Sequence, residues 1–131
     1  MNTQINHQWE EKIVIPHLHW FQNQDEVPNW LVQYRWQVNG ESKETDWTNQ
    51  ARQSAIFTYV SGVICQICNF GIINAPSNVN ASSILQLRLV RDTENASGLF
   101  SGADPYTGDA GALNYDIHKH CNRLGTTGEY A

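Results

Sequence analysis

The chain has 131 residues and a formal net charge of −5 at pH 7, a length that fits one ordinary domain and excludes two. Its eight basic residues are scattered, which excludes the concentrated positive charge that a nucleic-acid-binding surface requires. Only 16% of the residues are charged, against about a quarter in an average soluble protein, and this low fraction together with five Trp favours a surface that contacts other protein chains.

The N-terminal residues lack the basic stretch and apolar run of a secretory signal, so we expect no targeting signal. We expect a single domain that spans 1–131, with residues 1–11 as a flexible N-terminal arm. No apolar stretch in the chain has the length of a membrane span. The three cysteines are an odd number and do not match a secreted disulfide framework. We therefore expect folding in a reducing cytoplasm, without a membrane partner.

The first predicted strand covers residues 12–22, where two apolar rows alternate. One face carries Ile13, Ile15, His17, His19 and Phe21, and the other carries Val14, Pro16, Leu18 and Trp20. Because Pro16 has no N–H to donate, we expect this strand at a sheet edge or bulged at the proline.

The second predicted strand, 30–38, has the strictest alternation in the chain. Its aromatic and β-branched row consists of Trp30, Val32, Tyr34, Trp36 and Val38. A period of two over nine residues places one row inside a sheet and the other row outside. Asn39 and Gly40 then predict a hairpin turn, with a return strand around 45–48.

Further alternating segments lie at 54–60, 63–70, 83–91 and 112–121. In the last of them, Leu113, Tyr115 and Ile117 alternate with Asn114, Asp116 and His118. No segment has the apolar stripe of a helix. The sequence therefore predicts an all-β fold, an antiparallel β-sandwich of jelly-roll-like topology with about seven or eight strands. Its expected core or framework residues are Trp20, Trp30, Tyr34, Trp36, Leu87 and Tyr115.

The loop 92–111, rich in Gly, Ser and Asp, separates the last two predicted strands. Loops of this length are usually functional or reach a neighbouring chain. Its carboxylates do not have the spacing of an EF-hand calcium site, so we interpret the loop as solvated.

Histidines provide the one arrangement that predicts chemistry. His17 and His19 are two residues apart in one predicted strand, and His118 and His120 are two apart in another, so each pair points to one side. If the strands were neighbours, the four imidazoles could bind one metal ion, with Asp116 as a further ligand. However, the glutamate and the glycine frame of cupin metal sites are missing, and histidine serves equally well as a hydrogen-bonding residue. We therefore expect structural histidines and no metal, with metal binding as the alternative.

Other motifs predict no catalytic residues and no cofactor. Cys65 and Cys68 lie three apart in an apolar run, so on a strand their sulfurs would face opposite sides and could not bind one metal together. We interpret both as buried small hydrophobic residues. The chain contains neither a nucleophile elbow nor a phosphate-binding glycine loop.

Three stretches together resemble a group of structural proteins from tailed-bacteriophage particles. They are Ile15-Pro16-His17-Leu18-His19-Trp20, then 30–40, and then 85–130, which includes Asp104-Pro105-Tyr106-Thr107-Gly108-Asp109-Ala110 and Asp116-Ile117-His118. The resemblance covers roughly residues 13–130. It implies a virion component in which His17, His19 and His118 are framework residues, hydrogen-bonded to each other across adjacent strands.

The resemblance does not fix which virion component this is. Our first hypothesis is a capsid decoration or cement protein and no enzyme, assembled in the host bacterial cytoplasm and located in the virion. Its expected partners are copies of itself, as a homotrimer, and the major capsid protein or other virion proteins. The candidate contact residues lie in the long loop and are Asp104, Pro105, Tyr106 and Asp109. Two alternatives stay open: a tail, neck or fibre component that binds a glycan through exposed Trp, and a small cupin-like metal-dependent enzyme.

Overall fold

The computed structural model describes residues 1–4, 13–22, 26–52, 65–80 and 82–119. Within these ranges the chain forms eight strands. In chain order they are β1 (Asn2–Gln4), β2 (Ile13–Phe21), β3 (Trp30–Gln37), β4 (Thr48–Ala51), β5 (Cys65–Asn69), β6 (Ile73–Asn74), β7 (Ile84–Arg91) and β8 (Gly111–Lys119). No described segment is a helix that could cross a membrane.

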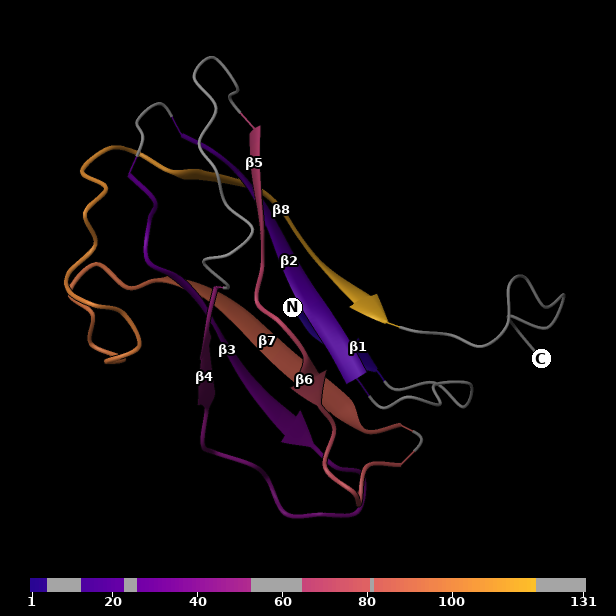
Figure 1. Ribbon diagram of the computed structural model, residues 1–131. Helices are drawn as coiled ribbons and strands as arrows, with labels where there is room; N and C mark the ends of the chain where they lie inside the picture. The colour runs from indigo at the N-terminus through magenta and orange to yellow at the C-terminus, as the bar shows by residue number, and fades with distance from the viewer. Residues whose placement is uncertain (5–12, 23–25, 53–64, 81, 120–131) are drawn as a thin grey trace, which may run out of the picture.

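The strands form two antiparallel sheets that pack face to face (Figure 1). Sheet A has the order β1-β7-β3-β4. In sheet B, β2 is central, with β8 along one side and both β5 and β6 along the other. The pair β3–β7 lies between β2 and β8 in the sequence, and the two pairs β2–β8 and β3–β7 belong to different sheets. A long antiparallel hairpin whose two halves fold into opposite sheets is a jelly-roll-like arrangement. The predicted all-β antiparallel sandwich is confirmed.

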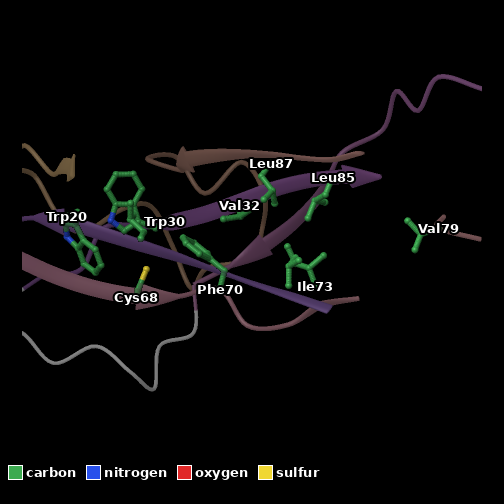
Figure 2. Packing of buried hydrophobic residues seen from close by; sticks show 11 residues of the cluster. Trp20, Trp30, Val32, Cys68, Phe70, Ile73, Val79, Leu85 and Leu87 are labelled. Carbon is green, nitrogen blue, oxygen red and sulfur yellow. The ribbon is translucent and has the colours of Figure 1, made fainter. Parts of the chain in front are cut away.

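One apolar cluster fills the space between the sheets (Figure 2). Its buried members are Val14, Leu18, Trp20, Trp30, Val32, Cys68, Phe70, Ile73, Val79, Leu85 and Leu87. The indoles of Trp20 and Trp30 meet edge to face across the two sheets, with ring centroids 6.4 Å apart. Tyr34, Trp36 and Tyr115 are partly buried against the cluster. All six residues expected in the core therefore lie in it or against it.

The central position of β2 contradicts the expectation of a sheet-edge strand. Opposite Pro16, the ladder on one side of β2 is interrupted between β5 and β6, where Gly71 has a φ of 76°. Phe70 in this gap donates its N–H to the Pro16 carbonyl at 3.0 Å. Because the N–H and C=O of a strand residue point to the same side, the missing N–H of Pro16 faces the interruption. A proline is therefore compatible with this central strand.

The pairing of β2 with β8 contains a bulge, which lies in β8. The register shifts between His19 and Trp20, and this leaves Leu113 as the extra residue of β8. Its side chain is 58% exposed. The alternation that placed Leu113 in one row with Tyr115 and Ile117 is therefore wrong at this residue, although the other two do pack against the core.

The predictions for the turn, the return strand and the N-terminal arm agree with the structure only in part. Gly40 has a φ of 92° and lies in the predicted turn, but the return strand is Thr48–Ala51, later than expected. Residues 2–4, which the sequence assigned to a flexible arm, form β1 and pair with β7. Most of the arm and the predicted strand 54–60 lie outside the described residues.

Candidate functional site

The outer face of sheet B carries the histidines that the sequence singled out. Along β2, burial alternates strictly, so Val14, Leu18 and Trp20 point inward while His17 and His19 point outward. This division of the strand into two faces is confirmed. The strand β8, which carries the second predicted pair, lies directly beside β2. The sequence analysis required the two histidine-bearing strands to be neighbours for their imidazoles to meet. The structure shows that they are neighbours.

Three side chains come together on this face, and we call them the His–Asp–His cluster: His17, Asp116 and His118. Asp116 is directly opposite His17 in the β2–β8 ladder. The ring centroids of the two histidines are 4.1 Å apart, with the ring planes at 59°. The His118 Nε2 lies 3.9 Å from the Asp116 Oδ2. In the part of the chain that the structure describes, this is the one group of three such side chains with a donor atom from each within 4.8 Å of the others.

The environment of the cluster favours the neutral form of His17. Burial lowers the pKa of the His17 imidazole, and the nearby His118 and His19 lower it further, while Asp116 acts in the opposite direction. The Nδ1 of His17 and the Oδ1 of Asp116 are buried, and neither has a hydrogen-bond partner among the described residues. A neutral imidazole retains a lone pair, so His17 can act as a ligand or hydrogen-bond acceptor.

The four predicted histidines are not equally placed. His17 and His118 touch through their rings, and no hydrogen bond joins these two residues, in contrast to the hydrogen bonding that we expected between them. His19 lies opposite Asn114, on the same face but outside the cluster. His120 lies outside the described residues. The cluster faces away from the interior, whereas the cupin-like alternative requires a pocket in the mouth of a barrel.

A groove at one end of the sandwich was not predicted. It has a volume of about 500 Å³ and lies between the β3–β4 connection and the segment after β6. Figure 1 shows the backbone of these two segments at the lower end of the view. Its lining is Tyr34, Trp36, Val38, Glu41, Ser42, Glu44, Asn74, Ala75, Pro76 and Asn78. The alternation assigned Tyr34 and Trp36 to the core, but at this end the sheets leave both rings only partly covered. Their partial exposure depends on the distant loops, so no local sequence signal marks the groove.

The long loop after β7 is organised around Arg91. The Arg91 Nε donates to the Asp104 carboxylate at 2.6 Å. The same guanidinium donates to the carbonyls of Gly108, at 3.0 Å, and Tyr106. The Tyr106 side chain is 2% exposed and the Asp104 side chain is also 2% exposed. Of the four candidate contact residues, these two stabilise the loop itself, and only Pro105 and Asp109 are exposed.

Asp92 holds the beginning of the same loop. Its carboxylate accepts the backbone N–H groups of Ala96, at 2.7 Å, and Ser97, at 3.0 Å. Hydrogen bonds from Ser97 and Ala96 lower the pKa of Asp92, because they favour its charged form. This loop is therefore a defined structure held by charged side chains, although most of its residues are exposed to solvent, as the sequence predicted.

The cysteine pair does not form a site. Cys65 and Cys68 face opposite sides of β5, as predicted. Burial raises the pKa of the Cys68 thiol to about 12, so this group stays protonated and unreactive. Cys65 is exposed, and its interpretation as a buried residue was wrong.

No known protein family, curated protein or solved structure matches this chain. The functional argument therefore depends on its own residues, and two arrangements offer a starting point: the outer face of sheet B with its His–Asp–His cluster, and the aromatic groove.

Proposed function

We propose that this protein is a structural component of a bacteriophage particle, and specifically a decoration protein that stabilises the head by contacting major capsid subunits. The proposal rests on the resemblance of three stretches to tailed-phage structural proteins. An antiparallel sandwich supports it, because such a fold presents broad, rigid faces to other subunits.

The observation that carries the proposal is a group of exposed apolar side chains on one outer face, beside its histidines. On sheet B, Phe21 of β2 and Ile67 of β5 are 37% and 46% exposed. Ile67 lies directly opposite His19, one outward position from Phe21. Leu113, at the bulge of β8, is 58% exposed on the other side of β2. Exposed apolar side chains gathered on one face are typical of a protein–protein contact surface.

The outer face of sheet A exposes one such residue in β7, Ile84 at 37%, and its long polar side chains are bonded to one another. Arg35 donates to Gln86 and Arg88 donates to Gln33, each at 2.6 Å. Both guanidinium groups also lie over the Trp47 ring, at 4.4 and 4.2 Å from its centroid. A face whose polar groups are already paired with each other is suited to solvent. We therefore assign the contacts between subunits to sheet B.

In this proposal, copies of the chain associate as a homotrimer and bury the apolar face of sheet B. The loop 92–110 then contacts the capsid through exposed residues such as Pro105 and Asp109. The loop is suited to this role because its internal hydrogen bonds fix its shape before it binds, so less conformational entropy is lost on binding.

The decisive experiment is cryo-electron microscopy of purified particles, combined with quantitative mass spectrometry of their proteins. We expect density for the sandwich on the outside of the head and a copy number close to that of the major capsid protein. Density confined to the tail or neck, or absence from the particle, would refute the decoration role.

A second candidate, a tail or fibre component that binds a glycan, is favoured by the groove. Tyr34 and Trp36 offer ring faces that can stack on sugars, and Glu41, Asn74 and Asn78 offer polar groups for hydroxyls. Titration of the full chain with host-surface oligosaccharides tests this function through Trp fluorescence. Saturable quenching that Trp36→Ala abolishes, together with a low copy number per particle, would favour this candidate.

A further inference from the structure

We propose that the His–Asp–His cluster binds a divalent transition-metal ion, with zinc as the reference ion, on the outer face of sheet B. The site lies on the same outer face of sheet B to which we assign the subunit contacts, but its test needs only the purified chain and no virion. The proposal runs against the expectation of structural histidines alone.

The backbone fixes which side chains meet at the site. His17 and Asp116 are directly opposite in the antiparallel ladder, and His118 is the next outward residue of β8. Neighbouring inward residues, Leu18 of β2 and Ile117 of β8, contact the core and hold this register. A shift of one residue would bury the cluster and expose the core, so the sandwich itself positions the ligands.

The donor atoms are close to the spacing that a metal requires. One donor atom from each of the three side chains lies within 4.8 Å of the others. In a tetrahedral site, metal–ligand bonds of about 2.1 Å place the ligand atoms roughly 3.4 Å apart. The side chain of His118 is 67% exposed and that of Asp116 is 39% exposed, so small rotations about their χ angles can close the difference.

Two unpaired atoms make a cation favourable at this place. The His17 Nδ1 and the Asp116 Oδ1 are both buried without a hydrogen-bond partner in the described part of the chain. Such atoms have lost contacts with water and have gained nothing in exchange. A metal ion coordinated by them would restore the lost interaction and would also separate two imidazoles from direct ring contact.

The donor set selects the class of ion. Two imidazole nitrogens and one carboxylate oxygen suit Zn²⁺, Co²⁺, Ni²⁺ and Cu²⁺, whereas Mg²⁺ and Ca²⁺ prefer sites built from oxygen atoms alone. Three protein ligands on an open face leave at least one coordination position for water or for a side chain of another molecule.

The test uses isothermal titration calorimetry of the full chain with zinc chloride, and the absorption spectrum after Co²⁺ addition. We expect one strong site per chain, visible-region Co²⁺ bands of a tetrahedral complex, and a higher Tm with zinc. His118→Ala and Asp116→Asn should each weaken zinc binding by at least about tenfold. The matched control is His19→Ala on the same face, which should bind zinc as the original chain does.

Each contrary result overturns the proposal. Absence of stoichiometric zinc binding by a folded chain would do so directly. Equal loss of affinity in His19→Ala, or unchanged affinity in His118→Ala, would place the binding elsewhere. Full competition by Mg²⁺ would contradict the assigned donor set. Circular dichroism of each variant confirms that altered binding does not reflect unfolding, and His118 is suited to this comparison because its side chain is exposed.

Discussion

Arg91 connects the end of β7 with three separate points of the loop that follows, and its removal should be costly. Truncation in Arg91→Ala leaves the Asp104 carboxylate buried without its partner and two carbonyls without a donor. We expect a loss of about 3 kcal/mol in the free energy of unfolding, measured by urea denaturation. Arg91→Lys should recover only part of it, because an ammonium group does not reproduce the geometry of the guanidinium.

The matched control for this change is Arg88→Ala on the outer face of sheet A. Arg88 is exposed and its bond to Gln33 is solvent-accessible, so we expect a loss of about 1 kcal/mol or less. Equal losses in the two variants would contradict the central role of Arg91 in the loop.

Asp92 should make the free energy of unfolding depend on pH in the acidic range. Its pKa is lowered in the folded protein, so the stability that it contributes is fully present above its unfolded pKa and is lost as the pH falls through its folded pKa. We expect the free energy of unfolding of the original chain to exceed that of Asp92→Asn at neutral pH. This difference should shrink below about pH 4. Urea denaturation at several pH values measures it, and a difference that does not change with pH would contradict the argument.

Among the elements, β8 is informative because its bulge divides it into two parts. Deletion of Leu113 removes the extra residue and leaves the register from Asn114 onward intact, so Tyr115 and Ile117 keep their inward positions. We expect a cooperatively folded protein with a loss of about 1–2 kcal/mol. Deletion of Tyr115 instead shifts one part of the strand by one residue and reverses its faces, and we expect failure to fold.

Circular dichroism and urea denaturation compare the two deletions. Equal tolerance of both would show that the pairing of β8 with β2 does not determine which residues of β8 face the core.

The same elements indicate what an amino-acid sequence can predict. The alternation in β2 and β3 identified their inward rows, because side chains of a strand alternate with a period of two wherever the strand lies. The place of β2 within sheet B could not be predicted in this way. Pro16 argued for an edge, and its tolerance depends on the gap between β5 and β6, far away in the sequence.

The candidate site likewise has features that the sequence predicts and features that it does not. The spacing of the histidines predicted that each pair shares a side of its strand, and Asp116 was placed with them. The ring contact of His17 with His118 depends on the register of two strands almost a hundred residues apart, which no local pattern encodes. The contacts of Arg91 with the loop and the groove beside Trp36 were missed for the same reason.

For the whole molecule, the two outer faces should differ in their effect on association. Ile67→Glu places a charge on the apolar face of sheet B, and we expect it to dissociate the proposed trimer. Asn49→Glu places the same charge on the outer face of sheet A and should leave the oligomer intact. Analytical ultracentrifugation measures both, and a monomeric original chain, or dissociation by both variants, would contradict the assignment of sheet B.

The contact between Trp20 and Trp30 has an optical consequence. One indole belongs to sheet B and the other to sheet A, and their planes meet at 65° with centroids 6.4 Å apart. Two chromophores this close and this strongly inclined couple their electronic transitions and produce a paired circular-dichroism band. The band reports the distance between the sheets rather than the strands within them. The appearance of this band during refolding would therefore mark the step at which the two sheets pack against each other.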